Sequence, residues 1–509
     1  MKIPQFLYPI VSMLLFASCA TAPSPASGTG TARARTNPRT NPMEAPHAEL
    51  SLEDAVLLAL SNNPDLEVQR FEPLVAGTFL AREQARYSPE IYGEISHRES
   101  RSSETARATG EQFDAEVEQT RLSAGVRREF ATGTEAELSA SHGADSSNRS
   151  PDQEEARLSL SLTQSLLRGR GREVNLIGIR RAELGLEISE EELRGFTEAL
   201  VAEVETAYWR FWLANETIAI TEQALEVAEQ QLSDIQQRIE VGQLARNEDA
   251  PARAEVARRR QALIDARAEL FRARMSLGTL ISPELDPDAA PRMAATLPEL
   301  PEPEGNVTPD NRIELALGYR PDLREARLRL EQRTLDTQLS RNGLLPRLDF
   351  FMDLAKTGFG PKTGDAWSDL SEDNYDVQAG LRFSRSLGER VENARDAETR
   401  FREDQAHAAV LNLERLIRTG IHLALNELDR AEQQVAASAE TRRLQELTVA
   451  SEVERFDVGA VTALQVAQAQ RDLLNAMIEE QNAKVNARIA LLELYRAEGS
   501  LLDRRGIGR

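Results

Sequence analysis

The fold of this chain is set out by a phrase that occurs twice, "NPDL" at residues 63–66 and "RPDL" at residues 320–323. The two phrases are 257 positions apart, and a further proline follows each of them at the same spacing, Pro89 and Pro346. Proline suits the first turn of a helix but breaks a helix further along. We therefore predict a duplicated chain, in which each PDL opens a helix and the later proline ends it and begins a strand.

Helical patterning dominates four regions, which are 172–241, 246–281, 388–457 and 462–497. In the first region two seams recur every seven residues, one large (Phe211, Ile218, Leu225, Leu232, Ile239) and one mostly small (Ala207, Ala214, Thr221, Ala228, Ile235). This period is typical of coiled-coil packing. Seventy residues at 1.5 Å per residue give a helix of about 105 Å. The pattern predicts long antiparallel helices.

Both long helices end in the same dipeptide, Val-Gly, within "RIEVGQL" at 238–244 and "RFDVGAV" at 455–461. Glycine suits the left-handed turn that ends a helix, because it carries no β-carbon. A shorter helix then returns. Each repeat is thus predicted to contain a lopsided helical hairpin, whose tips are Val241, Gly242, Gln243 and Leu244, and Val458, Gly459, Ala460 and Val461.

Segments between the helices alternate apolar and polar residues, as at 158–163, 347–354 and 377–383. A period of two predicts strands with one apolar face. After residue 18 no apolar stretch reaches the length of a membrane-spanning helix, so a chain that crosses a membrane would do so as a closed barrel. The residues expected to face lipid are Leu158, Leu160, Leu162, Leu348, Phe350, Leu381 and Phe383.

The first half carries an insertion. Pro89 and Ser165 are 76 positions apart, whereas Pro346 and Ser386 are 40 apart. The extra residues contain two alternating stretches on either side of "ATGT" at 131–134, which offers a turn. We predict an inserted β-hairpin.

The N-terminus has the anatomy of a signal peptide, predicted over 1–18, because Lys2 precedes a short apolar stretch that ends at Cys19. Cys19 is the only cysteine, which leaves pairing between chains, a free thiol or lipidation. "LLFASC" at 14–19 resembles the bacterial lipobox, so we expect Cys19 to be lipidated; the alternative is a cysteine that only ends the apolar stretch. Residues 19–48 are predicted to be a lipid-anchored, flexible linker.

Composition divides the remaining chain. Residues 49–281 are predicted to form the first structural repeat, the proline-rich 282–311 a helix-free linker, and 312–497 the second repeat. Residues 498–509 are expected to form a loose tail.

Charge and residue types exclude several functions. A net charge of −22 argues against nucleic acid as a partner. The five histidines show no metal-ligand spacing, and the paired carboxylates of the long helices are expected to be solvated. We therefore expect no metal, no cofactor and no enzymatic activity.

Together these features resemble the TolC-like outer-membrane efflux family over about residues 49–497. The resemblance is carried by the doubled PDL, "LSLTQSLLRGRG" at 160–171, the doubled Val-Gly tip, and "AYWRFW" at 207–212, whose aromatic residues are expected to pack where the helices meet the strands. It implies a mainly α fold of two repeats, with an α-barrel of long helices and a β-barrel of transmembrane strands. Members usually supply four strands per chain, so the inserted hairpin either adds two strands or folds over an end of the barrel.

The resemblance also implies a homotrimer in the outer membrane of a Gram-negative cell, with helices in the periplasm. The tips would contact a periplasmic adaptor protein of an inner-membrane pump, unless their glycines serve only to end the helices. Some relatives narrow the tunnel entrance with aspartates, but the matching positions here are Gln465 and Gln468. Glu248 and Asp249 either restore negative charge there or cap the returning helix, and we favour capping.

We therefore predict the outer-membrane channel of a tripartite efflux or type I secretion system, a passive duct for substrates delivered by the pump. The alternative is a lipid-anchored periplasmic coiled-coil scaffold without a pore. Only a channel requires the strands to present their apolar face to lipid.

Overall fold

The structure is a computed structural model that describes residues 49–105, 110–282, 292–293, 308–388 and 390–507. The predicted signal peptide, Cys19 and the linker to residue 48 lie outside the described residues, as does most of the proline-rich segment. From Leu50 onward, the described residues belong to one compact unit. Two-residue strands β1 (Glu49–Leu50) and β6 (Arg292–Met293) stand apart from the main sheet.

The first repeat contains helices before and after its strands. They are α2 (Leu52–Asn62), α3 (Pro64–Gln69), α4 (Phe71–Ala85), α5 (Arg172–Asn175), α6 (Ile177–Glu240), the short 3₁₀ helix η3 (Arg246–Glu248) and α7 (Asp249–Ile281). The PDL phrase opens α3, where Asn63 caps the helix by accepting a hydrogen bond from the Leu66 backbone N–H at 3.0 Å. The helix before the strands ends at Ala85, ahead of Pro89, as expected.

The second repeat has the same general order, but with two strands instead of four and with the short helix α10 between them. Its helices are α8 (Pro309–Tyr319), α9 (Pro321–Gly343), α10 (Thr363–Asp369), α11 (Arg390–Asp457), α12 (Ala463–Glu498) and α13 (Leu501–Arg504). The prediction of a helix-free linker to residue 311 was wrong at its end, because α8 begins at Pro309. Proline is tolerated there since the first N–H of a helix has no partner, and Thr308 caps the helix.

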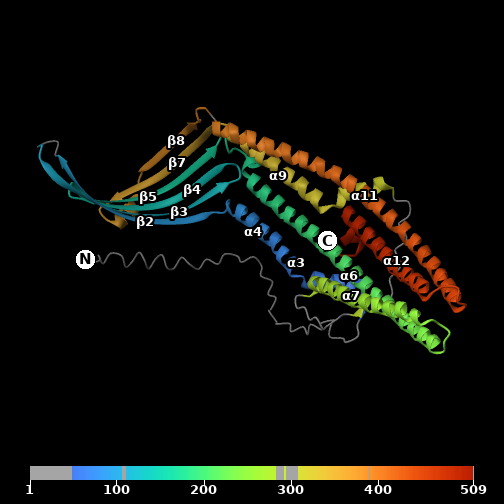
Figure 1. Ribbon diagram of the computed structural model, residues 1–509. Helices are drawn as coiled ribbons and strands as arrows, with labels where there is room; N and C mark the ends of the chain where they lie inside the picture. Colours follow the sequence, from blue (N-terminus) through green and yellow to red (C-terminus); the bar gives the residue numbers. More distant parts are fainter. Residues whose placement is uncertain (1–48, 106–109, 283–291, 294–307, 389, 508–509) are drawn as a thin grey trace, which may run out of the picture. The chain divides into compact units, whose positions relative to one another are not determined.

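Six strands form one antiparallel sheet in the order β2-β3-β4-β5-β7-β8. They are β2 (Glu90–Thr105), β3 (Gln112–Phe130), β4 (Thr134–Ser147), β5 (Ser150–Ser165), β7 (Arg347–Gly360) and β8 (Tyr375–Ser384). The inserted hairpin is β3–β4, and it adds two strands within the sheet between β2 and β5 (Figure 1). Its turn contains Gly133, with a φ of +83°.

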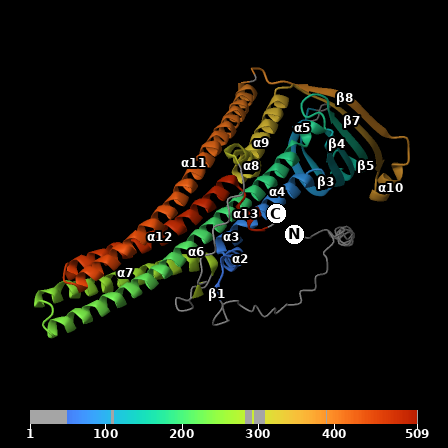
Figure 2. The same ribbon diagram turned by 90° about the vertical axis from the view of Figure 1, so that its right-hand side faces the viewer.

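The long helices pair as α6 with α7 and α11 with α12, and α9 packs between α6 and α11 (Figures 1 and 2). Along α6 the two predicted seams are buried to different degrees. The small-residue seam, from Ala207 to Ile235, is buried within the chain, whereas Ile218, Leu225 and Leu232 remain half-exposed. Small side chains let neighbouring helices approach closely, which explains why the small-residue seam is the one that packs within the chain.

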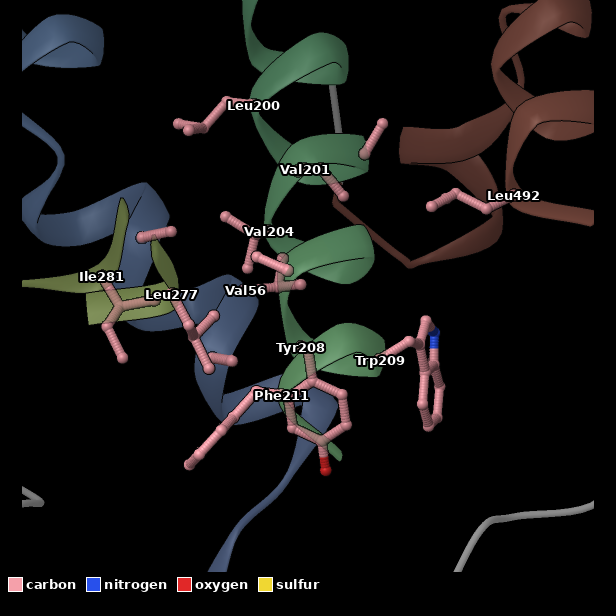
Figure 3. Packing of buried hydrophobic residues seen from close by; sticks show 14 of the residues in the cluster. Val56, Leu200, Val201, Val204, Tyr208, Trp209, Phe211, Leu277, Ile281 and Leu492 are labelled. Atoms are coloured by element: carbon pink, nitrogen blue, oxygen red, sulfur yellow. The ribbon is translucent and has the colours of Figure 1, made fainter. Parts of the chain in front are cut away.

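The largest hydrophobic cluster surrounds the aromatic residues of α6 (Figure 3). Tyr208, Trp209 and Phe211 pack against residues of α2, α7 and α12, such as Leu277 and Leu492. Their expected role in packing is confirmed, but the expected location was wrong. Trp209 lies 32 residues, about 48 Å, along α6 from the strands.

The C-terminal segment is also ordered, so the prediction of a loose tail from residue 498 was wrong. Helix α13 buries Leu501 and Leu502, and the Leu501 backbone N–H donates to Glu198 of α6 at 3.1 Å. Arg505 forms two hydrogen bonds of 2.6 Å with the carboxylate of Glu205. Two apolar residues among polar ones gave too short a pattern to reveal this docking.

Candidate functional site

One face of the six-stranded sheet is apolar in the half nearer the long helices, whereas its far half carries His97, Glu99, Glu118 and Glu154. Residues paired across antiparallel strands lie on the same face, so the register identifies its members. Leu160 pairs with Leu354, and Phe350 with Leu381. All seven residues predicted to face lipid share this face. It continues onto the inserted hairpin and β2 through Ile91, Ile95, Leu122, Val126 and Leu138.

The apolar face has the height of a membrane interior. Along β7 its rows run from Leu348 to Gly358, which at 3.3 Å per residue is about 33 Å. One row within this length contains Lys356, whose ammonium group donates to the carbonyls of Leu370 and Glu372. Strands of membrane barrels tilt by 35–45°, which reduces this length to about 25 Å, the usual height of their apolar band.

Many side chains of this face are exposed in the single chain. Ile91 is 82% exposed, Leu381 65% and Phe383 63%. A continuous apolar surface of this kind normally contacts a membrane or another protein.

The opposite face of the sheet is polar and is linked by cross-strand hydrogen bonds. The hydroxyl groups of Ser139 and Ser159 lie 2.7 Å apart, and Arg127 donates to Glu90 at 2.7 Å. The Tyr92 hydroxyl donates to Glu137. The sheet therefore has one face suited to lipid and one suited to water.

The two Val-Gly tips share one backbone geometry. Gly242 has a φ of +80° and Gly459 a φ of +75°. In the first tip the Gln243 N–H donates to the Arg238 carbonyl at 2.8 Å, and in the second Ala460 donates to Arg455 at 2.8 Å. With the Gly242–Ile239 and Gly459–Phe456 bonds, these are two Schellman motifs. Glycine is required in both because of its positive φ.

The tips also pack against each other. Arg238 of α6 forms an ion pair with Asp457 of α11 at 2.8 Å and lies over the Phe456 ring. Below it Ile235 and Val466 form a small apolar cluster. The two repeats are thus joined at the end farthest along α6 and α11 from the strands.

The predicted tip residues divide into two groups. Val241 and Val458 are 69% and 79% exposed, and the residues between them and the returning helices, Gly242, Gln243, Gly459 and Ala460, are exposed as well. Leu244 and Val461 instead pack inward against the tip cluster. The contact of all eight residues with a partner stays a prediction, in which Leu244 and Val461 differ from the others because they are partly buried against the apolar cluster.

Two of the four residues predicted near the entrance, Glu248 and Gln465, cap a helix, but that helix is α12, and among the described residues no side chain caps the returning helix α7 by a hydrogen bond. The Glu248 carboxylate accepts a hydrogen bond from the Ala463 N–H at 3.2 Å, so it caps α12 of the other repeat. Gln465 forms a capping box with Thr462. Asp249 accepts from Gln236, and this bond and that from Arg253 lower the pKa of its carboxyl group. Gln468 is exposed.

Sequence reasoning missed a set of buried acids around the C-terminal segment. Glu198, Glu205 and Glu498 are buried. Burial raises the pKa of Glu198 and of Glu205, although hydrogen bonds from the Leu501 N–H and from Arg505 oppose the rise. In the sequence these acids resemble many solvated glutamates on the same helices, so no local signal marked them.

Within the described ranges, no group of three or more His, Cys, Asp or Glu side chains is placed to hold a metal ion. Among the same residues, none of the helices combines the length and apolar character that a membrane span requires.

Solved structures of outer-membrane channels share this fold. The outer-membrane channel OprN is 19% identical, with a TM-score of 0.67 over 88% of this chain and 90% of its own. The Campylobacter jejuni CmeC channel is 17% identical, with a TM-score of 0.66 over 88% and 86%. The Vibrio cholerae outer membrane protein VceC is 17% identical, with a TM-score of 0.65 over 88% and 96%. No curated protein sequence matches this chain.

The family assignment rests on sequence. The family model described as outer membrane efflux protein matches residues 56–282 and 312–500, which include nearly all of both repeats and all six strands of the sheet. The chain belongs to the outer membrane efflux protein family, and it is located in the outer membrane.

Proposed function

We propose that this chain forms the outer-membrane channel of a tripartite efflux or type I secretion system. The channel would be a passive, water-filled duct for substrates delivered by an inner-membrane pump. The observation that carries the proposal is the two-faced sheet, with an apolar band about 25 Å high on one side and polar side chains on the other. A solvated scaffold would leave this apolar face in water, which disfavours the alternative.

Closure of the sheet needs further copies of the chain. Strands β2 and β8 are its two edges, and each pairs on one side only within the described chain. Unpaired strand edges are not tolerated in lipid. Three copies of six strands would give a barrel of eighteen, a size that leaves an aqueous channel in porins. We therefore infer a homotrimer in which β8 of one copy pairs with β2 of the next.

The tips are proposed as the contact with a periplasmic adaptor protein. Val241 and Val458 are equivalent residues of the two repeats, and both expose an apolar side chain at a turn. The Arg238–Asp457 ion pair and the Glu248 cap hold the two turns side by side. An adaptor would therefore meet two similar sites on each chain.

The proposal is tested by measuring the mass of the purified assembly and its conductance in a lipid bilayer. Protein purified in detergent is expected to have the mass of three chains by native mass spectrometry and to produce stepwise currents in a planar lipid bilayer. A protein that stays monomeric without detergent and never conducts would contradict the channel and favour the scaffold.

A further inference from the structure

A cavity of about 720 Å³ lies where the strands meet the long helices, and its lining is rich in arginine. Its basic residues are Arg86, Arg168, Arg181, Arg333, Arg395 and Arg402. Among the described residues, the acids Asp336, Glu392 and Glu398 accompany them. This local excess of positive charge stands in a chain whose net charge is −22. Figure 2 shows α9 and α11 meeting the strands at this level.

Four of these six arginines pair with a carboxylate, namely Arg86 with Glu129, Arg402 with Glu398 at 2.6 Å, and Arg181 and Arg333 with Asp336. Asp336 is shared by Arg181 at 3.2 Å and Arg333 at 3.4 Å. Arg168 donates its Nε–H to a backbone carbonyl, and in the described part of the chain neither Arg168 nor Arg395 lies within ion-pair distance of a carboxylate. Guanidinium N–H groups therefore remain available for a ligand.

Two long helices begin at the same cavity and add to its positive potential. Ile177 and Gly178, the first residues of α6, line it, as do Val391 and Glu392 in the first turn of α11. The residue before α6, Leu176, offers no side-chain cap. The unpaired N–H groups and the dipole of a helix N-terminus favour an anion.

The cavity lies on the polar side of the sheet. Arg86 pairs at 3.0 Å with Glu129, which follows Arg127 by two residues on the polar face of β3.

The side of α9 that faces away from the cavity is covered by another helix. Arg327 precedes the cavity residue Asp336 by nine residues, or two and a half turns, so the two side chains lie on opposite sides of α9. Arg327 donates to the Leu317 carbonyl of α8. Helix α8 therefore covers the side of α9 that faces away from the cavity.

We infer that this cavity is an anion-binding site for water-borne solutes that carry several phosphate, sulfate or carboxylate charges. The inference rests on the proposed function, because the polar side becomes a water-filled interior only if the sheet closes. Arginine binds such oxyanions through paired, charge-assisted hydrogen bonds. Solutes of this class would be held at the point where the helical part passes into the strands.

Calorimetry on the full chain in detergent tests the site, with tripolyphosphate as the probe. We expect saturable binding that weakens about tenfold in the double variant Arg168→Gln, Arg395→Gln, because each change removes a charge-assisted hydrogen-bond donor. The double variant Arg168→Lys, Arg395→Lys keeps the positive charge but loses the paired N–H donors of the planar guanidinium group. It is expected to bind tripolyphosphate with intermediate affinity. The matched control, Arg210→Gln, Arg418→Gln, removes two exposed arginines outside the cavity and should bind like the wild type.

Two results would overturn the proposed site. One is an equal affinity of the cavity variant and the control variant for tripolyphosphate. The other is no binding by a wild-type protein that circular dichroism shows to be folded. Phosphatidylglycerol in the micelles should not displace tripolyphosphate; displacement would show that lipid reaches the cavity and would overturn its interior placement. Because the binding is measured in detergent, it does not depend on pore formation. A wild type that binds the probe but never conducts would contradict the proposed function instead.

Discussion

The carboxylate of Glu248, at the first return helix, accepts a hydrogen bond from the backbone N–H of Ala463, the first residue of the second return helix, at 3.2 Å. The two repeats differ here. In the second, Thr462 and Gln465 form a capping box, whereas the first has Ala245 at the position equivalent to Thr462. Alanine cannot cap, and Glu248 is free to reach across to the other repeat.

Removal of this bond should loosen the second tip. Glu248→Ala is expected to destabilise the start of α12 by about 1 kcal/mol, the usual effect of a lost N-terminal cap. Hydrogen exchange at residues 463–466 measures the loss directly. Glu240→Ala, an exposed residue on the same hairpin, is the control and should leave that exchange unchanged. Equal protection in the two variants would contradict the cap.

The tip glycines are expected to resist substitution for reasons of backbone conformation alone. A β-carbon at Gly242 or Gly459 would meet no atom within 4 Å, but both glycines have a positive φ. Alanine at either position should therefore cost about 1–2 kcal/mol. Gly420→Ala, within α11 and equally uncrowded, should instead stabilise by up to about 1 kcal/mol. Thermal unfolding that gave all three variants the same shift would refute the explanation.

The buried Glu198 predicts a pH dependence with a definite sign. Burial raises the pKa of its carboxyl group above the ordinary value of 4.5, so the folded state binds this proton more tightly than the unfolded state. Its contribution to stability is therefore present at low pH and is lost as pH rises through the raised value. Glu198→Gln keeps an acceptor for the Leu501 N–H but cannot ionise.

The stability of Glu198→Gln relative to the wild type should thus increase from pH 4 to pH 8, as followed by thermal unfolding in detergent. Glu203→Gln, an exposed neighbour on α6, provides the control. If the stability of Glu198→Gln relative to the wild type stays constant or falls as pH rises, the raised pKa of the buried Glu198 carboxyl group is contradicted.

The division of the tip residues predicts a crosslinking pattern. A photo-reactive amino acid at Val241 or Val458 should crosslink to a periplasmic protein in intact cells, because both side chains point away from the chain. The same group at Leu244, which packs inward, should not. Equal crosslinking at Val241 and Leu244 would argue against a contact at the exposed turns.

The repeated and periodic features could be predicted from the sequence. The long helices, the hairpin β3–β4 and the Val-Gly turns depend on patterns within a few residues, such as the alternation around Leu160 or the glycine at 242. The common apolar face of the strands could be predicted as well, because successive side chains of a pleated strand point to opposite faces of the sheet.

Contacts between distant segments could not be predicted in this way. The Glu248 cap on Ala463 joins residues 215 positions apart, and the Arg505 pair with Glu205 joins residues 300 apart. The arginines of the cavity are scattered from Arg86 to Arg402, and nothing local distinguishes them from the solvated arginines of the same helices. Such sites appear only once the helices are placed side by side.

One face of the sheet is proposed to meet lipid and the other to meet water. Spin labels placed singly at residues 348–354 of β7, in protein reconstituted into liposomes, test this proposal through their collisions with oxygen, which enriches in lipid, and with a water-soluble nickel complex. Labels at Leu348, Phe350, Met352 and Leu354 should favour oxygen, and those at Asp349, Phe351 and Asp353 the nickel complex. Accessibility that does not alternate along the strand would contradict the account.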